Sequence, residues 1–428
     1  MAEAYVRTES HPDLPPPAGE SGVVGWLRHH LFNTWYNGLA TIIIVYLFYL
    51  ALPPIVDWAL ISPIWGANSY KDCQFDGAGA CWGMIDKRFG QFMYGFYDHD
   101  NRWRPNLAGI IFVIAMLPVL FDRLPGRGLA TTFLIFVFPA LGIALIHGPI
   151  DVQSMQTLLG KVIWALVFVA GAAVGYRAMR RLQPTLMTLG YGVSYVVLFL
   201  ALVAWGFGVP VIETSTYGGL MLTLILAGVA IAVSLPLGIL LALGRRASSL
   251  PIVRLLCVGF IELIRAVPLI TVLFMAQFML PLFLPEGTNF DNVVRAMVGM
   301  SLFSAAYMAE VVRGGLQAIA KGQFEAADSL GLNYFLNMRL IILPQALKIV
   351  IPGIVSTFIG LFKDTTLVSI VGLMDFLQIG KTSVADTKWL GLQHEAYFFV
   401  GITYFCFCFG MSRYSIYLEK KLHTGHKR

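Results

Sequence analysis

The sequence predicts an all-α membrane protein that crosses the bilayer about ten times. Only 13% of the residues are charged and 57% are hydrophobic, whereas soluble domains carry about 25% charged residues. Apolar runs of roughly 20 residues, the length that spans a bilayer as a helix, recur along the chain. These runs do not alternate as barrel strands do, and open sheet edges cannot be satisfied in lipid. The formal net charge of +6 therefore reflects loop topology and does not indicate nucleic-acid binding.

Ten apolar runs are long enough to be counted as spans. In order they are 37–60, 106–121, 129–147, 157–176, 185–207, 218–243, 255–284, 293–318, 345–362 and 394–412. The first 36 residues are polar and proline-rich and lack the pattern of a cleaved signal peptide. We therefore expect a cytoplasmic segment at 1–36, followed by an uncleaved anchor.

The distribution of Lys and Arg places both termini in the cytoplasm. The inside segments would be 1–36, 122–128, 177–184, 244–254, 319–344 and 413–428. With Arg313 and Lys348 at helix ends, they hold 19 of the 30 Lys and Arg residues. Segment 61–105 is the exception, because it carries five cations and many aromatic residues. We expect it to be a periplasmic loop with an amphipathic helix at the membrane interface.

The cysteines divide into two groups. Cys73 and Cys81 flank QFDGAGA in the predicted periplasmic loop, where a disulfide and two free thiols are both open. The other three lie in apolar spans, which is typical of packing residues. The sequence has no CxxC motif or histidine cluster that would indicate a metal site.

A GKT tripeptide at 380–382 does not complete a phosphate-binding loop. Such a loop needs a glycine five positions earlier, where this chain has Asp375. An ATP-driven transporter built from this chain would therefore need its ATPase on another subunit.

The stretch EAADSLGLNYFLNMRLIILP, at 325–344, interrupts the apolar sequence. Its acids suit a helix N-terminus, and Gly331 can end that helix in the left-handed conformation. A second amphipathic piece follows, and Pro344 precedes a new apolar run. The apolar side chains of these two helices would fit a groove on a partner protein. A solvated loop along the membrane remains the alternative.

The spacing of this stretch matches a known pattern. It reads Glu325-Ala326-Ala327, then Gly331, Ile341 and Leu343-Pro344. This resembles the cytoplasmic coupling signature of bacterial ABC importer permeases.

Other segments narrow the resemblance. Residues 218 to about 412 look like the polar amino acid branch of these permeases, through segments such as FIELIRAVPLITVLF and LFKDTTLVS. The N-terminal extension, with CWGMIDKRFGQF and WRP, resembles the M-subunit family of general L-amino acid permeases. One departure is Arg265-Ala266-Val267-Pro268, where the branch often has Arg-Gly-Thr-Pro.

The resemblance implies a type I ABC importer permease core behind extra transmembrane helices. The domains would be a cytoplasmic segment 1–36, an extension 37–215 with periplasmic loop 61–105, a core 216–414 with coupling helices 320–344, and a basic tail 415–428. ATPase coupling would fall to Glu325, Ala326, Ala327, Gly331, Leu343 and Pro344. The chain would be a non-catalytic permease for L-amino acids of broad specificity, in a bacterial inner membrane.

The same resemblance implies partners. They are a second, related permease forming a heterodimer, a dimeric ATPase and a periplasmic amino acid-binding protein, besides membrane lipid. This chain would bind no cofactor itself, and ATP–Mg would be bound by the ATPase.

Charged residues within the spans are candidates for function, because charge in lipid is costly. Glu262 and Arg265 are three residues apart, as are Glu310 and Arg313, so each pair can neutralise itself on one helix face. These pairs would hold helices together or form a gate.

A second group of polar residues, Lys363, Asp364, Thr365 and Thr366, follows a span that Pro352 and Gly353 interrupt. Broken helices supply ligand groups in transporters. We expect Asp364 to bind a substrate ammonium and Arg265 or Lys363 to bind the carboxylate. Ordinary interfacial charges are the open alternative.

Two other classes of protein remain as rivals. A stand-alone secondary transporter or channel would need its own coupling-ion site and no docking segment. A membrane-embedded enzyme would need paired carboxylates or a metal cluster at one interface, and the sequence shows neither.

Overall fold

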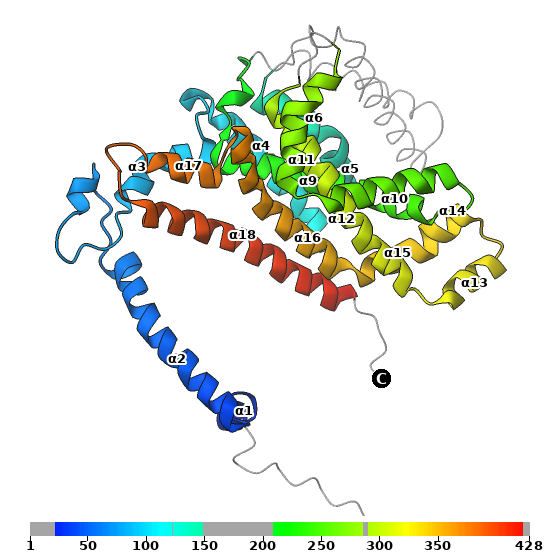
Figure 1. The fold of residues 1–428 in the computed structure, drawn as a ribbon, viewed down its shortest axis with the longest axis horizontal. Helices are drawn as coiled ribbons and strands as arrows, with labels where there is room; N and C mark the ends of the chain where they lie inside the picture. The colour runs from blue at the N-terminus through cyan, green and yellow to red at the C-terminus, as the bar shows by residue number, and fades with distance from the viewer. Residues whose placement is uncertain (1–21, 122, 149–208, 286–289, 423–428) are drawn as a thin grey trace, which may run out of the picture. The chain divides into compact units, whose positions relative to one another are not determined.

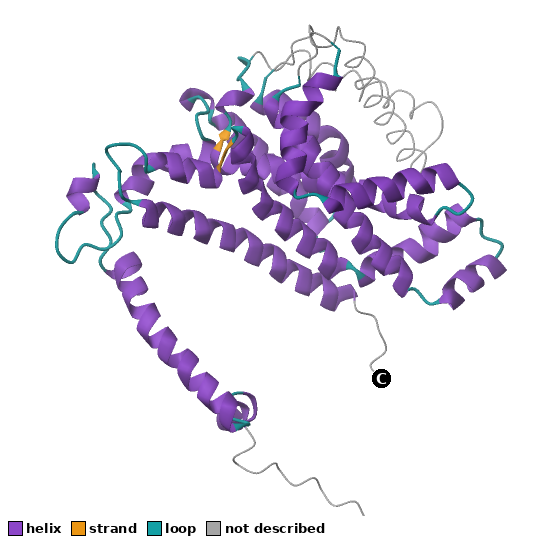
Figure 2. Ribbon diagram, in the orientation of Figure 1, coloured by secondary structure: helices purple, strands orange, loops and turns teal. Residues whose placement is uncertain are grey.

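The computed structural model describes residues 22–121, 123–148, 209–285 and 290–422, and these are almost entirely helical (Figures 1 and 2). They form two compact units, one ending at Met84 and one comprising Ile85–Arg428. The predicted spans 157–176 and 185–207 lie outside the described residues.

The first unit contains one long apolar helix. After α1 (Gly22–His30), α2 (Trp35–Val56) continues into a π-helical turn η1 (Asp57–Ile61). The combined helix Trp35–Ile61 is 27 residues long and exposes its apolar side chains on all sides. A helix that is apolar all round is typical of a membrane span, and this helix coincides with the first predicted span.

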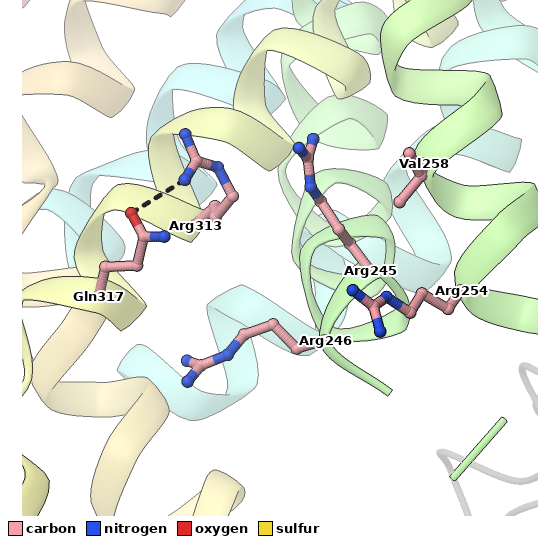
Figure 3. A pocket seen from close by; sticks show the side chains of 6 residues that line it. All are labelled: Arg245, Arg246, Arg254, Val258, Arg313 and Gln317. Carbon is pink, nitrogen blue, oxygen red and sulfur yellow. Dashed lines mark hydrogen bonds between the residues drawn. The ribbon is translucent and has the colours of Figure 1, made fainter. Parts of the chain in front are cut away.

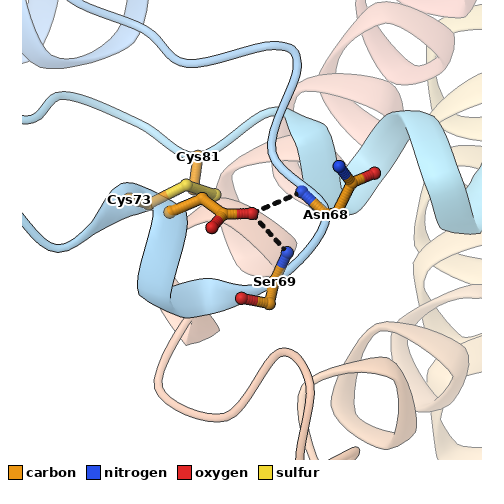
Figure 4. The surroundings of a disulfide bond; sticks show 5 residues. Asn68, Ser69, Cys73 and Cys81 are labelled. Atoms are coloured by element: carbon orange, nitrogen blue, oxygen red, sulfur yellow. Dashed lines mark hydrogen bonds between the residues drawn. A yellow bond between two sulfur atoms is a disulfide. The ribbon is translucent and has the colours of Figure 1, made fainter.

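A folded loop follows this helix. It contains the short 3-10 helix η2 (Tyr70–Cys73), and a disulfide joins Cys73 to Cys81 (Figure 4). The carboxylate of Asp72 accepts hydrogen bonds from the backbone N–H groups of Asn68 (2.8 Å) and Ser69 (3.0 Å). The indole of Trp82 donates to the carbonyl of Ala59 (2.9 Å), so the end of the loop returns to the end of the long helix.

The second unit begins with helices from the first half of the chain. They are α3 (Gly83–Tyr94), η3 (His99–Asn101), α4 (Trp103–Leu120), α5 (Arg127–Thr132), η4 (Phe133–Val137) and α6 (Phe138–Ile146). The stretches His99–Leu120 and Arg127–Ile146 are long and apolar enough to cross a membrane, as predicted.

The second half of the chain supplies the remaining elements. They are η7 (Thr214–Thr216), α9 (Gly219–Arg246), α10 (Pro251–Ala266), α11 (Leu269–Phe274), η8 (Met275–Met279), η9 (Leu280–Phe283), α12 (Asn292–Ala318), α13 (Lys321–Ser329), α14 (Tyr334–Asn337), η10 (Met338–Ile342), α15 (Leu343–Ile349), α16 (Ile351–Asp364), η11 (Thr365–Val371), β1 (Met374–Asp375), α17 (Phe376–Ser383) and α18 (Gln393–Leu422).

Within the described residues, six helices could cross a membrane by length and composition, or seven with one bent pair. The later ones are Gly219–Arg246, Ile351–Val371 and Gln393–Leu422. α12 has the length of a span, with 27 residues, but carries three charged side chains. The total of about ten spans stays a prediction.

The predicted span 255–284 is not one straight helix. α10 and the helical stretch Leu269–Phe283 meet at an angle of 108°. The break falls at Val267, which is extended (φ −116°, ψ 148°), directly before Pro268. A residue before proline is sterically driven out of the α region, and this explains the bend.

The packing of α9 against α12 is the central contact of the second unit. α9 buries small residues along this face, among them Ala230, Ser234 and Ala242. A Cβ added at Gly238 would lie 2.7 Å from the Cβ of Met308, so the two helices approach too closely for any larger residue there. Small residues allow this approach in membrane helix pairs.

The helix α3 packs into this unit and is not only an interfacial element. Phe92 is fully buried, with its ring edge-on to Phe376 and Phe399. Arg88 also forms an ion pair with Asp386. The predicted boundary at residue 215 lies inside the second compact unit. The two compact units themselves meet at residue 84.

Backbone contacts reinforce this packing. Gly95 pairs with Tyr217, and Gly218 and Gly219 pair with the two residues of β1. Gly219 has φ +62°, and a side chain there would collide with the carbonyl of Phe92. Glycine is therefore required where the first half of the chain meets the start of α9.

Candidate functional site

The stretch 321–349 forms a helical elbow. Figure 1 shows α13 and α14 together at one end of the second unit. α13 ends at Ser329, and Gly331, two residues later, is left-handed (φ +70°). The N–H groups of Gly331 and Leu332 donate back to Asp328 (2.9 Å) and Ala327 (3.3 Å), as at a glycine-terminated helix end. The side chain of Asn333 then caps α14 by accepting from the N–H of Leu336 (2.9 Å).

The sequence predicts that the acids of the elbow start its first helix, but this prediction is wrong. α13 begins at Lys321, because the residues before Glu325 already continue the helix. Glu325 therefore lies mid-helix, and Asp328 lies near its end. Asp328 instead accepts a 3.4 Å hydrogen bond from the side-chain amide of Asn337, so it links α13 to α14.

Pro344 does not open a new helix direction. The chain is helical from Tyr334 to Ile349. Pro344 lies in the first turn of α15, which directly follows the π-helical turn η10. Proline has no backbone N–H to donate, and a π-helical turn before it lets the helix continue without that hydrogen bond. The break comes at Val350 (φ −100°, ψ 10°), so the predicted span 345–362 is divided and the apolar stretch is Ile351–Val371.

The elbow exposes apolar side chains and is anchored by others. We call the exposed set the elbow surface: Leu330, Tyr334, Phe335, Leu336 and Leu340, which are between 38% and 74% exposed. Met338 and Ile342 are buried in one apolar cluster with Val312 and Leu316 of α12. The elbow is therefore tied to α12 while it presents apolar side chains outward.

The coupling-signature residues are distributed over both sides of the elbow. Ala327 is fully buried, whereas Glu325 and Ala326 are exposed. Leu343 is half-buried and Pro344 is exposed. Their assignment to ATPase coupling stays a prediction.

A network of charged side chains joins the C-terminal halves of α9, α10 and α12. We call Arg245, Glu262, Arg265, Glu310 and Arg313 the arginine–glutamate network. Glu310, whose side chain is 15% exposed, lies 2.7 Å from Arg245, 2.7 Å from Arg313 and 3.8 Å from Arg265. Glu310 therefore has three cationic partners.

The network corrects one predicted pairing. Glu310 and Arg313 do pair along α12, but Glu262 pairs with Arg245 of α9 (3.0 Å) and not with Arg265. Arg265 instead approaches Glu310 and the ring of Tyr307 (5.6 Å). Residue spacing identifies partners on the same helix only, and Arg245 comes from a neighbouring helix.

A cavity of about 490 Å³ lies against this network (Figure 3). It is lined by Arg245, Arg246, Arg254, Val258, Arg313 and Gln317. Figure 3 shows the four arginine side chains arranged around one space, with Arg313 donating to the side-chain amide oxygen of Gln317 (2.9 Å).

Sequence reasoning missed Arg245, Arg246 and Arg254 as site residues. It counted them only as signals of cytoplasmic topology. The acids Glu262 and Glu310 could have identified Arg245, because a carboxylate within a span needs a cation from a nearby helix.

The other predicted substrate residues do not gather into one site. Lys363 and Asp364 form the last turn of α16, inside the apolar stretch Ile351–Val371 and not after it. Thr365 is fully buried and its hydroxyl donates to the carbonyl of Phe362 (2.7 Å). Thr366 donates to the carbonyl of Lys363 (2.9 Å). No hydrogen bond or ion pair within the described residues joins this group to Arg265.

Asp375 has a structural position of its own. It is fully buried and caps α17, accepting from the N–H groups of Leu377 (2.9 Å) and Gln378 (3.3 Å). Burial raises the pKa of Asp375 to about 6, although the two hydrogen bonds oppose the increase. The GKT tripeptide lies in the second half of α17, so its backbone N–H groups do not form a helix N-terminus.

Comparison with known proteins identifies the family. A profile of the family described as "Binding-protein-dependent transport system inner membrane component" matches residues 234–424. The inner membrane amino-acid ABC transporter permease protein YhdY of Escherichia coli K12 is 45% identical over 97% of both chains. The chain belongs to the amino-acid ABC transporter permeases.

Two further permeases and one solved structure are also similar to the chain. The glutamate/glutamine/aspartate/asparagine permease BztC of Rhodobacter capsulatus is 42% identical over 99% of both chains. The Escherichia coli glutamate/aspartate import permease GltK is 35% identical and covers 47% of this chain and 91% of its own length. A crystal structure of an amino acid ABC transporter with histidines is similar at 30% identity, over 47% of this chain and 92% of that chain, with a TM-score of 0.42.

The chain is therefore a multi-pass, non-catalytic permease subunit of an amino-acid ABC importer. It works together with other ABC components such as an ATPase. The rival predictions, a stand-alone secondary transporter and a membrane-embedded enzyme, are not needed to explain it.

Proposed function

We propose that the elbow surface docks into a groove on a separate ATPase dimer and transmits its movement to the membrane helices. The observation that carries the proposal is the exposed apolar face on an elbow that is anchored to α12 through Met338 and Ile342. An amphipathic helix that presents its apolar face to a groove is a recurring recognition mode. ATP–Mg is bound by the ATPase and not by this chain.

The elbow is continuous with the transmembrane part of the unit. The helical path runs from Tyr334 to Ile349, and the next helix begins at Ile351. A displacement of the elbow would therefore move α15 as a rigid body and turn α16 about Val350. Alternating access follows as helices rock around the path.

We infer the wider assembly from the family resemblance. The permease pairs with a second, related permease in the bacterial inner membrane, with both termini in the cytoplasm and about ten spans in all. A periplasmic binding protein delivers L-amino acids to the permease, which has broad specificity.

Asp364 is the proposed partner of the substrate ammonium. Replacing Asp364 with Ala should lower transport while assembly is kept, and transport at the wild-type rate would remove it from the path.

The docking proposal is tested with Phe335→Asp, which places a charge on the elbow surface. Phe335 is 67% exposed, so the change leaves the permease core intact. The ATPase should no longer co-purify with this variant, although the variant reaches the membrane in normal amount. Leu250→Asp is the control, because Leu250 is an exposed apolar residue (55%) on another predicted cytoplasmic loop. If both variants retain the ATPase, the elbow is not the docking site.

A further inference from the structure

The cavity beside the arginine–glutamate network carries an excess of positive charge. Five arginines lie in the cavity wall or the network: Arg245, Arg246, Arg254, Arg265 and Arg313. Among the described residues, only two carboxylates, those of Glu262 and Glu310, form ion pairs with these arginines. The group as a whole has three more positive than negative charges.

The excess is concentrated on two of the arginines. Arg246 contacts the carbonyl of Leu316 (3.4 Å) and the ring of Phe324 (5.6 Å), and neither contact neutralises its charge. Arg254 is exposed, and no carboxylate among the described residues lies within ion-pair distance of it. Like charges held around one space repel each other, so an anion that enters the cavity would be bound by all of them.

The chemistry of the wall indicates a phosphate group. Guanidinium groups match the oxygens of phosphate in planar, two-bond geometry and bind it more specifically than an ammonium does. Arg245 and Arg313 are held in place by Glu310, so two of the donors are pre-positioned. A volume of about 490 Å³ admits a phosphate with a small substituent.

The surroundings of Arg254 indicate an amphiphile rather than a free ion. Ile252, Leu255 and Leu256 on the same helix are between 67% and 73% exposed. Val258, one turn further along α10, lines the cavity itself. The aliphatic side chains could hold acyl chains while the arginines bind a headgroup. Basic pockets between membrane helices at the cytoplasmic side are known to bind anionic lipid headgroups.

We propose that this cavity binds the phosphate headgroup of an anionic phospholipid, with its acyl chains along the exposed face of α10. Arg246 and Arg254 contact the headgroup, and Arg245 and Arg313 form the base of the site. The stacking of Arg246 on Phe324 connects the site to α13, one residue before Glu325. The bound lipid therefore acts on the elbow that the proposed function assigns to ATPase coupling, but lipid binding itself does not depend on that assignment.

The binding experiment uses the full chain, purified with its partner subunits in detergent and titrated with phosphatidylglycerol or phosphatidylcholine. Bound lipid is counted by native mass spectrometry. The variants are Arg254→Gln and Arg246→Gln, and Arg254→Lys tests whether charge alone suffices. Arg413→Gln is the matched control, because Arg413 is an exposed arginine on α18 and lies outside the cavity.

We expect wild type and Arg413→Gln to bind phosphatidylglycerol in preference to phosphatidylcholine. Each of the two cavity variants should lose roughly fivefold in affinity for phosphatidylglycerol, the loss that one basic residue near a lipid headgroup contributes. Arg254→Lys should lose less affinity than Arg254→Gln but stay below wild type, because an ammonium keeps the charge and not the two-bond geometry. Equal affinities in Arg254→Gln and Arg413→Gln would overturn the proposal.

A second arm separates the lipid from a free anion. Inorganic phosphate is added at rising concentration to the complex that carries phosphatidylglycerol. If the acyl chains contribute as proposed, phosphate displaces the lipid only weakly. If inorganic phosphate binds as tightly as phosphatidylglycerol, the ligand is a free anion and the lipid proposal is wrong.

Discussion

Gly331 offers a sharp test of the elbow, because the structure separates its backbone requirement from its packing. Its φ of +70° lies in the left-handed region, yet no heavy atom lies within 4 Å of a Cβ added there. A larger side chain therefore meets no neighbour, and the whole cost arises in the backbone. That cost is about 1–2 kcal/mol for an ordinary residue, and a β-branched residue is the least suited to this region.

The change to make is Gly331→Val, with Gly331→Asn as its control. A penalty of about 1–2 kcal/mol lowers the population of the native turn roughly 5- to 30-fold. Gly331→Val should lower substrate-stimulated ATP hydrolysis and amino acid uptake by the reconstituted complex several-fold. The thermal unfolding midpoint of the membrane core should stay near that of wild type, since the elbow turn lies outside the core clusters.

Gly331→Asn should behave much more like wild type, because asparagine tolerates the left-handed conformation. Two results would refute the reasoning. Wild-type coupling in Gly331→Val would show that the turn geometry does not matter for function. Equal damage from Val and Asn would show that the effect comes from the surface of the elbow and not from its backbone.

Two further predictions concern stability. Glu310→Gln leaves three arginines without their shared carboxylate, and it should lower the free energy of unfolding by about 3 kcal/mol in thermal or denaturant melts. The control is Glu262→Gln, at a side chain that is 56% exposed, which should cost less than about 1 kcal/mol. Similar losses in the two variants would contradict the central role of Glu310. The pKa of Asp375, about 6 against the usual 3.8, means that folding favours its protonated form. Its contribution to stability is therefore fully present below about pH 4 and is lost, by at most about 3 kcal/mol, as the pH rises through about 6. Asp375→Asn keeps a capping side chain and should remove that pH dependence, which melting curves at about pH 5 and about pH 8 would detect; an unchanged dependence would assign it to another group.

The features that the sequence predicted well depend on local chemistry. A glycine between two amphipathic pieces indicated the turn at Gly331, because the left-handed conformation excludes most other residues. The apolar runs predicted the long helices for a similar reason, since each run satisfies its own backbone hydrogen bonds. Such signals need no information from other parts of the chain.

The features that were missed depend on contacts between segments or on backbone adjustments. The partner of Glu262 is Arg245, 17 residues away on another helix, and residue spacing along α10 cannot reveal it. The bend at Val267 was hidden because apolar residues continue on both sides of Pro268. Pro344 does precede an apolar run, but the helix continues through it, and the π-helical turn before it leaves no mark in the sequence.

The glycine contacts between the end of α3 and the start of α9 determine how this chain could be shortened. GltK matches 47% of this chain over 91% of its own length, so a related permease about half as long exists. Here a chain shortened to begin near residue 216 would lose Phe92, whose ring packs edge-on against Phe376 and Phe399. The second compact unit begins at Ile85, so a shortened chain would have to keep the helices from α3 onward to keep this packing.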